Sequence, residues 1–131
     1  MNIFRATISQ IESIDNLNII KCYFLDQRLE LLSLELGNGI KVGSMVELTT
    51  KPSNISIAKN FTGMVSCFNQ IKSKIKEVEN GELLSSIKLI VGESIIESII
   101  TKEMSLKMNL KEDDEVNIFI NQSELSIFRV L

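Results

Sequence analysis

The side chains that most often carry out catalysis are scarce in this sequence. Histidine is absent, which removes the commonest general base and the commonest protein ligand of zinc and copper. A catalytic triad that depends on histidine is therefore impossible within the chain. Only two cysteines occur, Cys22 and Cys67, so cysteine-rich zinc and iron–sulfur sites are excluded as well. We interpret each cysteine as a small buried hydrophobe that stays reduced.

One acidic cluster remains as a possible site, Glu112-Asp113-Asp114-Glu115. It lacks the alternating ligand spacing and the glycine of an EF-hand calcium loop. We therefore interpret it as a solvated loop and expect no protein-held metal ion. Because no nucleophile–base pair can be identified either, we expect that the chain is not an enzyme.

The net charge and the aromatic residues bear on the partners of the chain. Lys and Arg total 14 and Asp and Glu total 17, so the formal net charge is −3. A protein that binds single-stranded nucleic acid needs a basic groove and exposed aromatic side chains. Three phenylalanines instead fall in strand patterns that are typical of a core, Phe24, Phe119 and Phe128. We expect no direct nucleic-acid binding.

No part of the sequence indicates export or a membrane. The N-terminus lacks a charged segment followed by an apolar one, which is the pattern of a secretory signal. No apolar run approaches the roughly 20 residues that a membrane helix requires. We therefore expect a cytoplasmic protein with no membrane partner.

The elements that would position any site follow an internal repeat. Phe4–Ile8 and Ile71–Ile75 share one pattern (apolar, basic, small, polar, Ile), which defines a first offset, from Phe4 to Ile71. Ser53–Ile57 and Ser123–Ile127 also match and define a second offset, from Ser53 to Ser123. The second offset exceeds the first by three, so the second copy is slightly longer. The sequence therefore predicts two repeats, residues 1–60 and 64–131.

Each repeat shows five short apolar segments rich in β-branched residues, which favour strands. In the first repeat the predicted strands are Ile8–Ile11, Leu17–Leu25, Leu29–Leu36, Met45–Thr50 and Ile55–Ala58. In the second they are Gln70–Val78, Leu83–Val91, Ser94–Ile100, Val116–Ile120 and Leu125–Val130. A short helix, Lys102–Met108, with Thr101 as its N-cap accounts for the additional length of the second copy.

These elements predict an all-β fold of two OB-like five-stranded β-barrels in tandem, with a short helix in the second repeat. One unit alone is close to the lower size limit for a stable core. An odd number of strands also leaves sheet edges that another chain can pair with. We therefore expect a homodimer or a higher oligomer.

The order of several short motifs resembles the molybdate-binding Mop (TOBE) family. Ser66–Lys72 resembles that family's Ser-Ala-Arg-Asn-Gln-Leu-Lys, and Ile100–Glu103 its Ile-Thr-x-Glu-Ser. Leu110-Lys111 is similar to Leu-Lys-x-Gly, and Ile120–Ser123 to Ile-Lys-Ala-Ser. In the first repeat, Thr50–Ala58 looks like the closing strand of a TOBE unit. The resemblance covers nearly the whole chain.

The resemblance implies a tandem Mop protein that binds molybdate or tungstate between subunits. Such proteins store the oxyanion, or form the sensing part of a molybdate-responsive regulator or a module of a transporter. The intact oxyanion is held by hydrogen bonds and cations, with no direct metal ligand from the protein. The oxyanion-binding residues that it implies here are Lys51, Ser53, Ser66, Asn69, Thr101 and Ser123.

The sequence departs from the family at three polar positions. Phe68 stands at the family's arginine, Asn121 at its lysine and Met104 at its second serine. The first repeat also begins too late to contain a Ser-Ala-Arg-Asn segment. The alternative is therefore a degenerate TOBE pair that acts mainly in dimerisation or protein interaction. In that alternative the same side chains have structural roles, as strand-entry partners, a helix cap and a solvated lysine.

Overall fold

Apolar and polar residues alternate along most of the chain, and successive side chains of a strand point to opposite faces of its sheet. In β6 (Asn69–Asn80), Ile71, Ser73 and Ile75 are buried while Lys72 and Lys74 are exposed.

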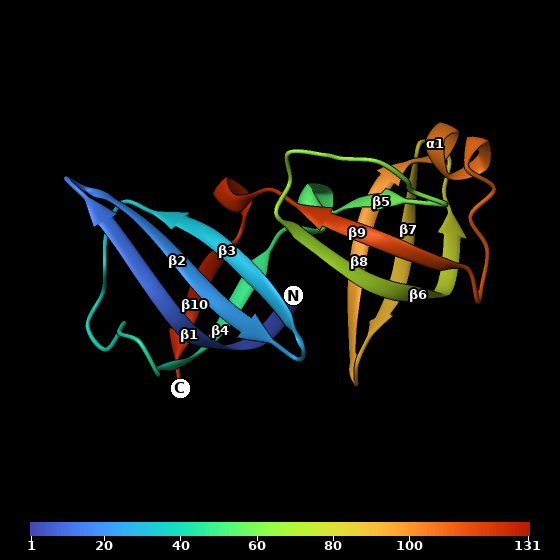
Figure 1. The fold of residues 1–131 in the computed structure, drawn as a ribbon. Helices are drawn as coiled ribbons and strands as arrows, with labels where there is room; N and C mark the ends of the chain where they lie inside the picture. Colours follow the sequence, from blue (N-terminus) through green and yellow to red (C-terminus); the bar gives the residue numbers. More distant parts are fainter.

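The structure is a computed structural model that describes all 131 residues. It contains two five-stranded antiparallel sheets that lie side by side (Figure 1).

Each sheet has the same strand order. The first sheet runs β10 (Ser126–Val130), β4 (Met45–Thr50), β1 (Asn2–Ile14), β2 (Leu17–Phe24) and β3 (Gln27–Ser33). The second runs β5 (Ser56–Ala58), β9 (Glu115–Ile120), β6, β7 (Leu84–Val91) and β8 (Ser94–Thr101). The helix α1 (Lys102–Lys107) follows β8, and two 3-10 turns, η1 (Pro52–Asn54) and η2 (Gln122–Glu124), follow β4 and β9. Two OB-like units in tandem are thereby confirmed.

The strand register confirms the two offsets of the internal repeat. In the first sheet Arg5 of β1 pairs with Glu47 of β4, and in the second Lys72 of β6 pairs with Asn117 of β9. Arg5 and Lys72 are related by the first offset, and Glu47 and Asn117 are related by the second. The additional length lies between β8 and β9, where α1 is found and the first repeat has only a loop.

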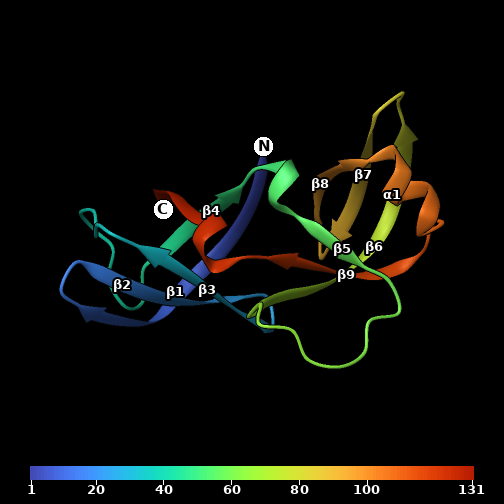
Figure 2. The ribbon, with the colours of Figure 1, turned by 90° about the horizontal axis from the view of Figure 1, so that it is seen from above.

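The two sheets exchange their last strands. β5 ends the first repeat in sequence but pairs with β9 of the second, and β10 ends the second repeat but pairs with β4 of the first (Figures 1 and 2). For β5 the cause is the preceding turn η1, which packs against β8 of the second sheet. There the Ser98 hydroxyl donates to the carbonyl of Ile55, the residue after η1, at 2.6 Å. The sequence boundaries at 1–60 and 64–131 are therefore not the boundaries of the sheets.

Two predicted strands differ from the observed ones by three or more residues at one or both ends. The first was expected to be Ile8–Ile11, whereas β1 begins at Asn2 because small and polar residues, Asn2 and Ala6, continue the buried face of the strand. The third was expected to reach Leu36, whereas β3 ends at Ser33. Ser33 pairs with Asn18 near the start of β2, so the following residues have almost no further strand to pair with.

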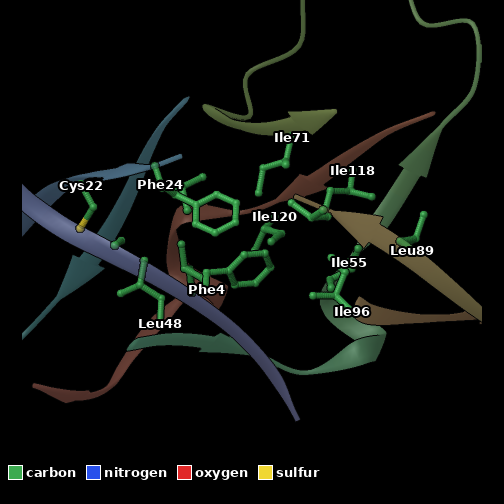
Figure 3. Close-up of a cluster of buried hydrophobic side chains, with 14 of the residues drawn as sticks. Phe4, Cys22, Phe24, Leu48, Ile55, Ile71, Leu89, Ile96, Ile118 and Ile120 are labelled. Atoms are coloured by element: carbon green, nitrogen blue, oxygen red, sulfur yellow. The ribbon is translucent and has the colours of Figure 1, made fainter. Parts of the chain in front are cut away.

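A single apolar cluster of 22 buried residues extends through both halves (Figure 3). Phe4 and Phe24 meet edge to face in it, with ring centroids 5.3 Å apart, an arrangement that aromatic pairs prefer. The placement of Phe128 in the core was wrong, because the side chain is 48% exposed at an irregularity of β10 between Ile127 and Arg129.

The two cysteines differ in their surroundings. Cys22 is fully buried, and burial raises the pKa of its thiol to about 11. Cys67 is only half-buried, and its thiol donates to the Ile120 carbonyl at 3.4 Å. The expectation that both are buried therefore holds for Cys22 and is too strong for Cys67.

The acidic segment 112–115 forms a turn before β9. Burial alone would raise the pKa of Asp114, but hydrogen bonds from the Lys59 ammonium and the Lys111 backbone N–H lower it below its ordinary value. No group of three or more acidic or cysteine side chains is arranged to hold a metal ion. No helix has the length and apolarity needed to cross a membrane.

Candidate functional site

The 3-10 turns η1 and η2 occupy equivalent places in the two repeats, each directly after a central strand. Lys51 is the extended residue that precedes η1, and Asn121 is its equivalent before η2. Neither side chain caps its turn. Lys51 is exposed and makes no ion pair or side-chain hydrogen bond, so its ammonium group is free to meet a ligand.

Hydrogen bonds from both sides of η1 bring it against the end of η2. The Thr50 hydroxyl donates to the Glu124 carbonyl at 2.7 Å, and the Asn54 amide donates to the Glu124 carboxylate at 2.8 Å. As a result, Lys51 and Ser123 line one hollow of about 530 Å³, although they are far apart in sequence. Its other lining residues are Met1, Asn2, Thr49, Thr50, Pro52, Asn54, Glu124 and Ser126.

The chemistry of this hollow suits a small anion with many acceptor atoms. Its lining includes Lys51, Asn54, Ser123 and Ser126, whose ammonium, amide and hydroxyl groups can donate hydrogen bonds. Glu124 is the exception, because its carboxylate accepts the Asn54 amide and offsets the charge of Lys51. The hollow therefore contains several hydrogen-bond donors, but the positive charge of Lys51 is balanced by the negative charge of Glu124.

The other predicted oxyanion-binding residues do not line this hollow. Ser53 and Ser66 are exposed, in η1 and in the loop before β6 respectively. Thr101 is exposed at the start of α1, where its hydroxyl accepts the Met104 backbone N–H at 3.2 Å. Thr101 thus caps the helix as predicted. Within one chain, the structure brings together only Lys51 and Ser123 of the six predicted residues.

Asn69 is completely buried and joins the two halves. Its side-chain oxygen accepts the backbone N–H of Glu30 at 2.6 Å, and its amide donates to the Glu30 carbonyl at 2.8 Å. These bonds connect the start of β6 to the edge strand β3 of the other sheet. The geometry assigns Asn69 a structural role and gives it no open surface toward a ligand.

The equivalent residue of the first repeat, by the first offset, is Asn2, which is 3% exposed. Its side chain accepts the Glu97 backbone N–H at 2.8 Å and donates to the Glu97 carbonyl at 2.9 Å. A third contact, at 3.3 Å, reaches the carbonyl of Thr50, next to Lys51. The first repeat therefore retains the asparagine of the motif that it was expected to lack. The first offset, which relates Phe4 to Ile71, also relates Asn2 to Asn69 and could have identified Asn2 from the sequence.

Comparisons with known proteins bear on the fold. No protein-family model matches the chain, and no curated protein matches it. Among solved structures, it is similar to a crystal structure of the cytoplasmic molybdate-binding protein ModG with molybdate bound. The two sequences are 20% identical, the match covers 96% of this chain and 94% of the other, and the TM-score is 0.89. This chain therefore has the fold of ModG over nearly its whole length.

Proposed function

We propose that the protein binds molybdate or tungstate, for intracellular storage and homeostasis or as the ligand-sensing part of a molybdate-responsive regulator. The observation that carries this proposal is the full-length likeness to a structure with molybdate bound. The hollow that contains Lys51 and Ser123 supports it independently, because it gathers a free ammonium group and several hydroxyls.

Molybdate is a compact dianion that accepts hydrogen bonds and donates none at neutral pH. Hydroxyls, amides and one cation can hold such an anion, and the charge-assisted bond from a cation is the strongest of them. Phosphate keeps a proton near pH 7, and this proton would face donors without an acceptor. We therefore expect molybdate and tungstate to bind more tightly than phosphate.

Further donors can come from a second copy of the chain. Ser53, Ser66 and Thr101 are exposed and lie outside the hollow, so a homodimer can present them to an anion held by Lys51 of the other subunit. The exposure of these three side chains supports a site between subunits.

Calorimetric titration with molybdate, tungstate, sulfate and phosphate tests the proposal. Lys51→Ala should weaken tungstate binding about 30-fold, the value of a hydrogen bond to a charged group. Ser123→Ala should weaken tungstate binding by a smaller factor, because water can replace a neutral hydroxyl. Lys41→Ala is the matched control, since Lys41 is exposed and lies outside the hollow, and it should leave the affinity unchanged.

The second candidate function is a protein-interaction module without tight oxyanion binding. Glu124 favours it, because a carboxylate in the hollow opposes an incoming dianion. If none of the four anions produced heat above dilution, this second function would replace the first. If phosphate bound as tightly as tungstate, the donor-only description of the site would be wrong.

A further inference from the structure

A second hollow, of about 590 Å³, lies on the second sheet and shares no residue with the Lys51 hollow. It is bounded by neighbouring strands β5, β9, β6 and β7. The charged and amide side chains in its lining are Lys72, Lys74, Glu115, Asn60 and Asn117. Lys72 and Lys74 alternate with the buried Ile71, Ser73 and Ile75, so the lysines belong to the outer face of the sheet.

The same place on the first sheet holds a buried carboxylate. Glu47 of β4 is 4% exposed and accepts the Nε–H of Arg5 at 3.2 Å and the Nε–H of Arg129 at 2.6 Å. The three residues form one row across β1, β4 and β10, because Glu47 pairs with Arg5 on one side and with Arg129 on the other. The first sheet thus supplies its own carboxylate to its cations.

In the second sheet the carboxylate of this row is missing. Lys72 takes the place of Arg5 and Asn117 the place of Glu47, and these two residues pair with each other. On the other side Asn117 pairs with Ala58 of β5. The equivalent of Arg129 by the second offset is Lys59, whose ammonium turns instead to Asp114 at 3.1 Å. Asn117 is shorter than Glu47, and Ala58 pairs with Asn117 where Arg129 pairs with Glu47. The hollow of the second sheet therefore lies beside smaller side chains.

The donors around this space have few partners within the chain. Lys72 makes no ion pair or side-chain hydrogen bond, and the amides of Asn60 and Asn117 make none either. Lys74 has only a long contact of 3.8 Å with the exposed Asp113. Two lysines and Glu115 leave a net charge of one positive unit in the lining, which matches an anion with a single charge.

We propose that this hollow is a binding site for the carboxylate group of a small organic acid, which takes the position that Glu47 occupies in the first sheet. Lys72 and Lys74 supply the opposite charge, and the amides of Asn60 and Asn117 donate to the carboxylate oxygens. The acyl chain of the ligand lies against Ile90 and Ala58, which are also in the lining. The site is independent of oxyanion binding at Lys51.

Titration of the full-length protein with propionate, followed by NMR, tests this assignment. The side-chain amide signals of Asn60 and Asn117 should shift and saturate. Lys72→Ala should weaken binding about tenfold, as expected for the loss of a charge-assisted hydrogen bond. Lys41→Ala, outside the hollow, should leave the binding curve unchanged.

Asn117→Glu provides the sharpest variant, because it places an internal carboxylate beside Lys72 as Glu47 lies beside Arg5. It should abolish propionate binding while the protein stays folded, which the chemical shifts of the first sheet would show. If Asn117→Glu does not fold, Asn117→Ala serves in its place and should weaken binding without filling the hollow. Wild-type shifts that grow linearly without saturation would overturn the proposal. So would saturation by sulfate or molybdate at these amides with no response to propionate.

Discussion

Ser73 carries a hydroxyl that no other polar group of the protein meets. The residue is 9% exposed, and its Oγ atom is buried without a hydrogen-bond partner. The equivalent residue of the first repeat is Ala6. Because an unpaired buried hydroxyl costs about 1–3 kcal/mol, we expect Ser73→Ala to raise the free energy of unfolding by about 1 kcal/mol in urea denaturation.

The matched control is Ser85→Ala. Ser85 is also buried, but its hydroxyl donates to the Asn80 side chain at 2.6 Å, so its removal should lower the free energy of unfolding. Equal destabilisation by both substitutions would show that the Ser73 hydroxyl has a partner after all.

The cysteines allow a second test at the scale of single residues. Thiolate is the reactive form, and burial holds Cys22 in the thiol form with a pKa of about 11. A thiol reagent such as DTNB should therefore modify at most one cysteine of the native protein at pH 8, and both after unfolding. Cys67→Ser should remove the native reaction. Rapid modification of Cys22 in the folded state would contradict its burial.

At the scale of elements, Glu47 of β4 binds the exchanged strand β10 to the first sheet through its ion pair with Arg129. A hydrogen bond from Arg129 is the main cause that lowers the pKa of Glu47, with Arg5 adding to it. A carboxyl with a lowered pKa stabilises the folded state above its ordinary pKa of 4.5, and this contribution disappears as the pH falls through the folded value. We expect Glu47→Gln to lower the thermal midpoint at pH 7, by an amount that shrinks below pH 4.5.

Glu12→Gln is the control for this comparison. Glu12 pairs with Lys21 at 3.4 Å, but both side chains are substantially exposed, and exposed pairs contribute little to stability. Thermal unfolding followed by circular dichroism from pH 7 to pH 3 would separate the two glutamates. A pH-independent difference between wild type and Glu47→Gln would exclude ionisation of Glu47 as the cause.

At the scale of the whole molecule, the exchanged strands make each half depend on the other. Removal of residues 126–131 deletes β10 from the end of the second repeat, yet this strand pairs with β4 in the first sheet. Tyr23 of β2 is the only tyrosine, and tryptophan is absent, so tyrosine fluorescence reports on the first sheet. The truncated chain should show unfolding of the first sheet by fluorescence at lower urea than the intact protein. Unchanged fluorescence would mean that β10 is dispensable for the first sheet.

Assembly is the other property of the whole molecule. β10 lies at a sheet edge and carries the exposed Phe128 and Val130, and an exposed apolar edge is a surface that a second chain can pair with. We therefore expect light scattering at micromolar concentration to give at least twice the 14.8 kDa of one chain. A mass of one chain that persists on concentration would exclude the homodimer and, with it, a site built between subunits.

The sequence by itself determined the local elements and the repeat. Alternation of apolar and polar residues is a local property, and it placed the strands from β2 onward to within a few positions of their observed ends. The Thr101 cap likewise depends only on neighbours, since its hydroxyl meets the backbone N–H of Met104. The two offsets required nothing beyond comparison of the two halves, and the strand register reproduces them.

Only the tertiary structure decided which distant segments meet. The exchange of β5 and β10 depends on how η1 and η2 pack on the opposite halves, and no alternation pattern encodes the partner of an edge strand. The same packing brings Lys51 to Ser123, joins Asn2 and Asn69 to edge strands of the opposite sheets, and buries Glu47 between two arginines. Each of these contacts joins residues that are far apart in the chain, so their geometry follows from the pairing of the sheets and not from the local sequence.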